Sequence, residues 1–336
     1  MDNKGTLLSG SQKTPGPLAS AHLSFTSFAP YRWFSSVIVR VIDKLGLSGR
    51  GLVIGLPYVW LLLFFLFPFV IVLKLSFSEI AIAIPPYKPL WSWVEGIYLN
   101  IQLSFESYQL LFEDSLYIKS YLTSIKIAAI STILALLIGY PMAYGMVRAP
   151  KQWRTTLLML VILPFWTSFL IRVYAWIGIL KTNGLLNLLL LKLGIIAEPL
   201  TMLNTNFAVY LGIVYSYLPF MILPLYANLE KLDASLLEAA SDLGCRPFKA
   251  FWAVTIPLSI PGIVAGCFLV FIPAVGEFVI PDLLGGSDTL MIGKTLWVEF
   301  FNNRDWPLAA AVAVLLLLIL IVPIVLFQKF QERAAS

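Results

Sequence analysis

The chain has 336 residues, of which 59% are hydrophobic and only 12% are charged. A soluble globular domain is about 45–50% apolar and about 25% charged, so one soluble core cannot hide this excess, and a lipid-covered surface is predicted. The net charge of +5 is modest. The sequence suggests no compact basic surface interleaved with aromatic residues. The net charge therefore indicates membrane topology and no nucleic-acid partner.

The first 50 residues are expected to form a cytoplasmic tail. Residues 1–30 are rich in Ser, Pro, Thr and Gly, a composition typical of disorder. In residues 31–45, apolar positions recur at helical spacing between basic ones, which is the pattern of an interfacial amphipathic helix. A helix packed on the protein's own membrane domain explains this pattern equally well. The tail lacks a leading apolar run with a cleavage site, so no cleaved signal peptide is predicted.

Six runs have the length and composition of membrane-spanning helices, which need roughly 20 mostly apolar residues. They cover residues 52–75, 120–147, 155–180, 206–229, 257–281 and 307–328. Each contains proline, which is tolerated in membrane helices because neighbouring groups satisfy the freed backbone. The predicted fold is an all-α membrane protein with kinked helices. Residues 51–330 form its transmembrane domain and residues 331–336 a C-terminal tail.

Lysines and arginines predict the orientation of these helices. With the N-terminus inside, the inner segments hold more than twice as many as the outer ones, so both termini are expected in the cytoplasm. The first outer loop, about residues 76–118, is acidic, with Lys88 as its one basic residue before Lys119. Two interpretations remain: a surface that meets a partner or a cationic solute, or an ordinary solvated loop.

The inner loop over residues 233–257 is the longest between the predicted helices and is not simply polar. Ser235 is a candidate N-cap, with Glu238 completing a capping box. Gly244 is placed to end that helix, and a second short helix is expected over about residues 247–253. Two short helices at an angle would make a rigid cytoplasmic knob that can transmit force from a moving partner.

This loop resembles the EAA signature of binding-protein-dependent ABC import permeases. The matching positions are Glu238-Ala239-Ala240, Gly244 and Val254-Thr255-Ile256-Pro257. The spacing agrees, and the last element differs from the family's Ile-x-Leu-Pro by two conservative changes. In the family this loop docks into a groove on a cytoplasmic ATPase. The resemblance implies that the coupling residues are Glu238, Ala239, Ala240, Gly244 and Pro257. The alternative is a connector whose EAA run is only good helix-forming sequence.

The resemblance covers about residues 50–330. Within the family, the chain is similar to the polyamine branch of these permeases, and most of all to its putrescine-type first permease subunit. It is carried by GRGLVIGLPYVWLLLFFLFPF, ILPFWTSFLIRVYAWIGIL, FIPAVGEFVIPDLLGG and EFFNNRDWP. It implies the type I ABC importer fold in a bacterial inner membrane, among membrane lipid. The implied partners are a second homologous permease subunit, two ATPase subunits and a periplasmic polyamine-binding protein. By resemblance this chain is not an enzyme and binds no cofactor, because the partner ATPase uses the ATP.

Candidate site residues follow from the chemistry of the solute that this branch carries. Putrescine and spermidine are chains of ammonium groups, so their pathway needs carboxylates and aromatic faces. Glu277, expected in the outer half of the fifth helix, is the foremost candidate because an intramembrane charge costs ~2.5–3.5 kcal/mol on insertion scales. Asp282 follows just outside. The aromatic candidates are Trp166, Tyr174, Trp176 and Tyr217. An equally weighted alternative pairs Glu277 structurally with Arg172, and the two roles can alternate.

Other functions stay open at this point. A permease for another cationic solute fits the same acidic outer loop. An ion-coupled secondary transporter would show more paired intramembrane charges and internal repeats. A membrane-embedded enzyme or a metal site would need clustered ligands or catalytic groups, yet the one histidine, His22, lies in the polar tail and the two cysteines lack ligand spacing. We predict no catalytic residue and no metal site. Gly262 and Gly266 form a GxxxG that indicates close helix packing, with the partner permease as one candidate.

Overall fold

The structure is a computed structural model that describes residues 49–94 and 98–335. Nearly all of the predicted tail, including the amphipathic helix expected over residues 31–45, lies outside the described residues. The chain divides into two units, residues up to Val70 and residues from Ile71 onward.

The described part of the first unit is an apolar helix. It holds α3 (Gly49–Leu61), a π-helical segment η2 (Leu62–Leu66) and the start of α4 (Phe67–Ser76). The span from Val53 to Ser76 is long and apolar enough to cross a membrane. A helix that is apolar on every side needs lipid or another protein to cover it.

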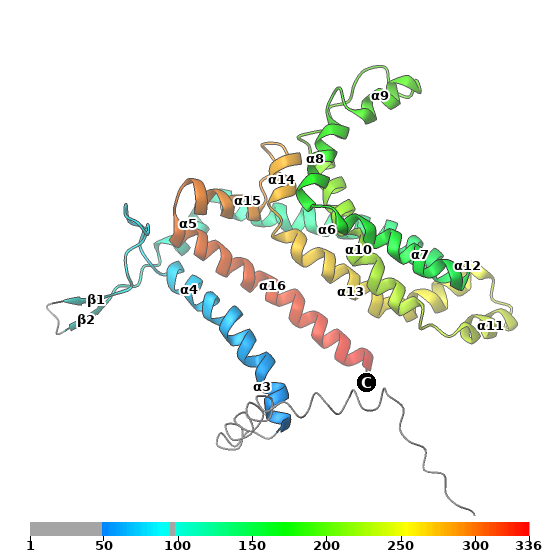
Figure 1. Cartoon of the computed structure of the whole chain (residues 1–336), viewed down its shortest axis with the longest axis horizontal. Helices are drawn as coiled ribbons and strands as arrows, with labels where there is room; N and C mark the ends of the chain where they lie inside the picture. The colour runs from blue at the N-terminus through cyan, green and yellow to red at the C-terminus, as the bar shows by residue number, and fades with distance from the viewer. Residues whose placement is uncertain (1–48, 95–97, 336) are drawn as a thin grey trace, which may run out of the picture. The chain divides into compact units, whose positions relative to one another are not determined.

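The second unit is a helical bundle with a small hairpin (Figure 1). Its first outer loop holds β1 (Trp91–Val94) and β2 (Tyr98–Ile101), an antiparallel pair with Trp91 opposite Ile101. The helices that follow are α5 (Glu106–Glu113), α6 (Ser115–Arg148), α7 (Lys151–Ile162), η3 (Leu163–Trp166), α8 (Phe169–Leu180), α9 (Leu185–Lys192) and α10 (Asn206–Leu229). The remaining ones are α11 (Ala234–Asp242), α12 (Pro247–Ala250), η4 (Phe251–Thr255), α13 (Ile256–Val275), α14 (Val279–Leu284), α15 (Ile292–Trp297), η5 (Val298–Asn302) and α16 (Trp306–Ala335).

Six helical segments of the described chain are long and apolar enough to cross a membrane, as predicted. Two of the expected runs are interrupted by breaks in the helix. The third run is broken at Thr167 and Ser168, so η3 and α8 are separate and the candidate span becomes Phe169–Lys192. The fifth helix ends at Val275 instead of continuing to residue 281. Which side of the membrane holds the termini stays a prediction.

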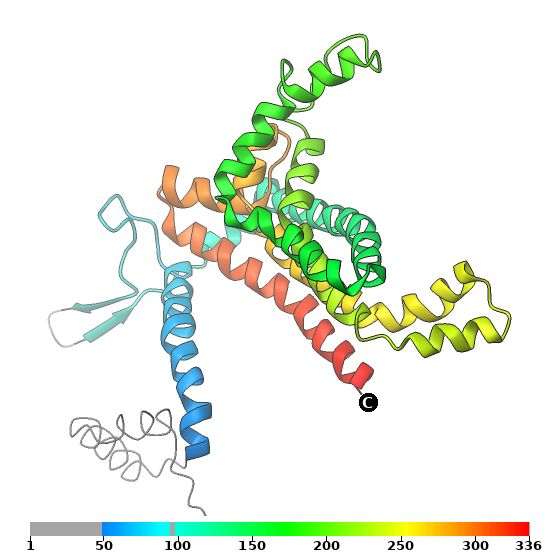
Figure 2. The same cartoon turned by 45° about the vertical axis from the view of Figure 1, so that its right-hand side comes forward.

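The core of the bundle lies where α6, α10 and α13 pack against one another. Gly262 and Gly266 of α13 make this possible, because a Cβ at either position would collide with Asn228 or Met221 of α10. The GxxxG therefore serves close helix packing, as predicted, and the contact is made with α10 of this chain. Figures 1 and 2 show α11 and α12 projecting beyond the ends of α10 and α13.

The inner loop forms two helical elements. Asp233, and not Ser235, caps α11, because its Oδ1 accepts a hydrogen bond from the Ser235 amide at 3.0 Å. Gly244 ends α11 with φ of +76°, and the Cys245 amide bonds the Ala240 carbonyl at 2.9 Å, a left-handed C-terminal cap. The second helix does not stop at residue 253, since α12 continues through η4 into α13.

Candidate solute cavity and coupling surface

A cavity of about 660 Å³ lies between α8, α10 and the α13–α14 junction. Most of the lining residues are aromatic or apolar. Three of the others have polar uncharged side chains, one is basic and one is acidic. The lining residues are Phe165, Thr167, Phe169, Arg172, Ser216, Tyr217, Phe220, Pro273, Gly276, Glu277, Phe278 and Val279. We call it the solute cavity.

Glu277 lies in the break between α13 and α14, and not within a helix as expected. Its carboxylate accepts hydrogen bonds from the amides of Val279 at 3.0 Å and Ile280 at 3.4 Å, which caps the start of α14. The hydroxyl of Tyr217 donates to its other oxygen. Only 8% of Glu277 is exposed. The carboxylate is therefore held in place from two sides at the wall of the solute cavity.

Arg172 lines the same cavity from α8. Its guanidinium lies over the rings of Phe165 and Phe169, at 5.2 and 5.9 Å from their centres. Its Nε is buried and has no hydrogen-bond partner among the described residues. The structure thus brings Arg172 and Glu277 to one cavity, but no ion pair joins them in the described part of the chain.

The other predicted pathway residues lie elsewhere. Trp166 and Tyr174 are exposed, at 79% and 58%, and neither lines the solute cavity. Trp176 packs its ring against Tyr215 with 5.4 Å between ring centres. Asp282, on α14, pairs with Lys294 of α15 at 3.2 Å. Of the six residues proposed for the pathway, the cavity gathers Glu277 and Tyr217.

Aromatic lining residues were missed by the sequence analysis. Phe165, Phe169, Phe220 and Phe278 supply most of the ring surface around the carboxylate. Phe169 offered a signal, since it precedes Arg172 by three residues and so shares its helix face. Phe278 also stacks on Trp297 of α15, with 4.6 Å between the centres and 9° between the planes.

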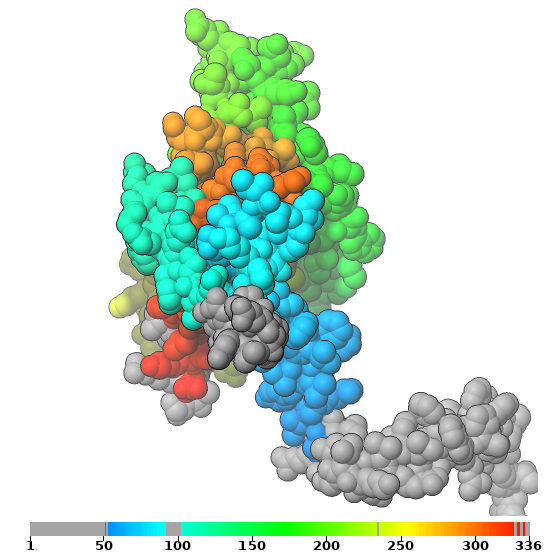
Figure 3. Space-filling model, turned by 90° about the vertical axis from the view of Figure 1, so that its left-hand side faces the viewer, coloured from blue at the N-terminus to red at the C-terminus, as the bar shows by residue number. Residues whose placement is uncertain are grey.

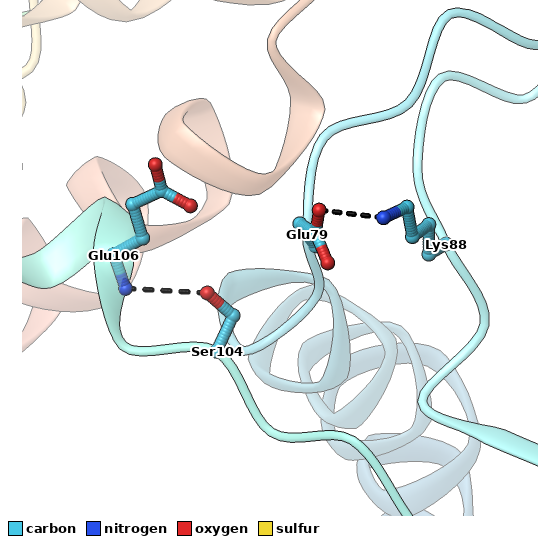
Figure 4. Close-up of polar contacts among 4 residues, drawn as sticks. All are labelled: Glu79, Lys88, Ser104 and Glu106. Atoms are coloured by element: carbon cyan, nitrogen blue, oxygen red, sulfur yellow. Dashed lines mark hydrogen bonds and ion pairs between the residues drawn. The ribbon is translucent and has the colours of Figure 1, made fainter.

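The first outer loop is rich in acidic residues, and one of them forms an ion pair. Glu79 pairs with Lys88 at 2.6 Å, and the Glu106 amide bonds Ser104 (Figure 4). In Figure 3 the cyan surface of the first outer loop lies against the orange surface of α15 and η5. Burial raises the pKa of Asp305 at the start of α16, and the nearby carboxylates of Glu299 and Glu106 raise it further. Whether this loop meets a partner or a cationic solute stays a prediction.

The predicted coupling residues lie on the projecting inner loop. Glu238, Ala239, Gly244 and Pro257 are exposed, whereas Ala240 is half-buried. Apolar side chains stand out from the same loop, with Leu243 at 89% and Phe248 at 76% exposure. Exposed apolar groups on a rigid projection are typical of a docking surface.

The comparisons with known proteins agree with this arrangement. Residues 135–335 match the family of binding-protein-dependent transport system inner membrane components. The chain belongs to this family. It is 41% identical over 266 residues to the spermidine/putrescine transport system permease protein PotB of Haemophilus influenzae, covering 79% of this chain and 88% of that protein. PotB of Escherichia coli K12 is also 41% identical, over 76% of this chain and 88% of that protein.

A solved structure supports the fold of the permease. The match is the crystal structure of a bacterial alginate ABC transporter in complex with alginate pentasaccharide-bound periplasmic protein. Its TM-score is 0.65 at 15% identity, and the match covers 88% of this chain and 99% of that chain. The importer permease fold predicted from the sequence is confirmed, and the β1–β2 hairpin of the first outer loop was not predicted. The permease is a multi-pass inner membrane protein of bacteria, and family membership decides against a secondary transporter or an enzyme.

Proposed function

We propose that this chain is a permease subunit of an ATP-driven importer of spermidine and putrescine, and that it forms half of the pathway. The observation that supports this most is the solute cavity, which offers a carboxylate among aromatic rings in a chain 41% identical to PotB. Carboxylates pair with ammonium groups, and aromatic faces attract them. The methylene segments between the ammonium groups suit the remaining apolar walls.

The proposed complex contains a second homologous permease, two ATPase subunits and a periplasmic polyamine-binding protein. This chain binds no cofactor in it, because the ATPase subunits use the ATP. The charge of the solute cavity supports a second permease. The cavity holds one carboxylate, Glu277, and one guanidinium, Arg172, so this half alone does not balance a solute with two or more positive charges. The partner permease would supply the missing carboxylates.

The proposed mechanism is alternating access driven from the inner loop. Closure of the ATPase dimer would move α11 and α12, which carry Glu238, Gly244 and their neighbours. The helix from Pro247 to Val275 is 29 residues long, or about 43 Å at 1.5 Å per residue. It ends two residues before Glu277. A movement at its inner end therefore reaches the solute cavity directly.

The experiment is uptake of labelled putrescine and spermidine by proteoliposomes that contain the complete complex. In Glu277→Gln the amide oxygen still accepts from Val279 and Ile280, so assembly should be unchanged. Loss of a charge-assisted contact of about 1.5–3 kcal/mol should lower uptake at least about tenfold. Glu113→Gln, an exposed change on α5, is the matched control.

Two results would overturn the proposal. Uptake of neither polyamine by the wild-type complex would remove the substrate assignment and favour another cationic solute. Wild-type uptake by Glu277→Gln would remove Glu277 from the pathway and leave it as the cap of α14. Arg172→Gln tests the alternating pair, since freeing the carboxylate from a competing cation should tighten solute binding.

A further inference from the structure

A second cavity, of about 510 Å³, lies at the root of the inner loop. The inner ends of α6 and α10 and the start of α7 form one side of it. The other side is α11 together with the η4–α13 segment. Its lining residues are Tyr144, Val147, Arg148, Arg154, Leu229, Glu230, Leu232, Asp233, Leu236, Leu237, Val254, Thr255 and Leu258. We call it the root cavity.

One buried polar group in its wall lacks a partner. Thr255 is only 2% exposed, and its hydroxyl has no hydrogen-bond partner among the described residues. Buried hydroxyls in folded proteins almost always have one, so each exception calls for a missing ligand or water. Thr255 also closes the π-helical segment η4, and such segments occur often at functional sites.

The root cavity holds two guanidinium groups and two carboxylates, and both carboxylates already have partners within the described residues. Glu230 accepts a hydrogen bond from the Tyr226 hydroxyl at 2.8 Å and lies 3.8 Å from Arg154. Asp233 is occupied by the Ser235 amide. Arg148 is exposed and lies over the ring of Tyr144, at 4.6 Å, with no carboxylate partner within the described residues. The exposed guanidinium and the buried hydroxyl can both donate hydrogen bonds to oxygen atoms that carry negative charge.

The remaining walls are apolar and lie at the membrane boundary. Leu236 and Leu258 line the cavity and are 46% and 41% exposed. Leu258 belongs to the candidate span Pro247–Val275, and Arg148 is the last residue of the span Ser115–Arg148. An anion that fits must combine a charged group at the water boundary with an apolar tail. Basic pockets between helices at this level are typical sites for anionic lipid headgroups.

We propose that the root cavity binds the phosphate of an anionic phospholipid. Arg148 and Arg154 contact the phosphate, the Thr255 hydroxyl donates to one of its oxygens, and an acyl chain lies along Leu236 and Leu258. The lipid would join α11 to the inner ends of α6 and α7. Any effect of the bound lipid on the stiffness of the inner loop rests on the coupling function proposed above. The binding of the lipid does not rest on that function.

The test is native mass spectrometry of the complete complex extracted from vesicles of phosphatidylglycerol and phosphatidylcholine. Arg148→Gln should retain about tenfold less phosphatidylglycerol, the value of one charge-assisted contact. Thr255→Val keeps the shape of the side chain and should retain less as well. Lys151→Gln removes an exposed charge from the same end of the bundle, outside the cavity, and should retain as much as the wild type.

Three outcomes would overturn the proposal. The first is equal retention of phosphatidylglycerol by Arg148→Gln and Lys151→Gln. The second is equal retention of the two lipids by the wild type. The third is full displacement of the lipid by millimolar inorganic phosphate, which would make free phosphate the ligand. Retention is measured without transport, so failure of polyamine uptake and failure of lipid binding are separate results.

Discussion

The contact between α10 and α13 gives a prediction that can be worked out from distances. A Cβ added at Gly262 would lie 2.7 Å from the Cβ and 3.1 Å from the Cγ of Asn228, and 3.2 Å from the Pro224 carbonyl oxygen. Carbon atoms in contact prefer about 3.5–4.0 Å. The Asn228 Cβ is fixed to its helix, so the two helices must separate by about 1 Å. Overpacking of this kind costs about 1–3 kcal/mol.

The assay for Gly262→Ala is the free energy of unfolding of the purified permease in detergent. Gly145→Ala and Gly178→Ala are the matched controls, because both lie inside helices and a Cβ there would meet nothing within 4 Å. Alanine favours a helix over glycine by about 1 kcal/mol, so the controls should be neutral or stabilised. A Gly262→Ala permease as stable as the two controls would refute the close packing of α10 on α13.

Three further predictions follow from single groups. Gly244→Ala should fray α11 at a cost of about 1–2 kcal/mol, because φ is +76° and only the backbone is strained. Co-purification of the ATPase with the Gly244→Ala permease should then fall. Gly244→Asn should recover part of it, because asparagine tolerates this conformation better. Equal co-purification with the wild type, Gly244→Ala and Gly244→Asn would contradict the docking role. Tyr217→Phe should destabilise the permease by about 1–2 kcal/mol, because it removes a charge-assisted donor to Glu277, and an unchanged free energy of unfolding would show that this bond adds nothing. Asp305 has a raised pKa in the folded protein, so the folded state binds its proton more tightly and stability should increase as the pH falls from above that pKa toward 3.8. Asp305→Asn should flatten this part of the curve of unfolding midpoint against pH. An unchanged slope would show that Asp305 does not cause this pH dependence.

The membrane spans and the inner loop could be predicted from the sequence because their signals are local. Lipid-facing helices need apolar residues on every side, so hydropathy finds them without tertiary information. The loop is defined by spacing, with Gly244 at a position that requires a left-handed backbone. The capping residue was missed by two positions because Asp233 and Ser235 are both good caps, and only the backbone geometry distinguishes them.

The breaks within apolar runs could not be predicted in the same way. Hydropathy counts apolar residues on both sides of Ser168 or Gly276 and runs across the gap. Glu277 was consequently expected inside a helix, whereas the end of α13 at Val275 frees its carboxylate to cap α14. Just before the break at Ser168, Trp166 is exposed and Phe165 lines the cavity.

Helix faces explain which aromatic candidates reached the cavity. Tyr174 follows Arg172 by two residues, so it points to a different side of α8 and is exposed. Trp176 shares the Arg172 face but lies one turn further on, where Tyr215 occupies its ring. A sequence can rank residues by chemistry, but the face that meets the cavity depends on how α8 packs against α10.

The two cavities lie toward opposite ends of one continuous helix, and this placement constrains how the permease can work. Thr255 stands near the inner end of the segment Pro247–Val275, and Glu277 follows its outer end. A rotation of about 5° at the base of a lever of about 43 Å displaces its tip by about 4 Å. That exceeds the length of the hydrogen bonds that hold Glu277. A small movement of the inner loop is therefore enough to remake the contacts of the carboxylate, provided that the prolines at 261 and 273 do not absorb it. Replacing either proline by alanine should strengthen the link between ATP hydrolysis and uptake if the helix acts as this lever, and weaken it if the kinks are the moving parts.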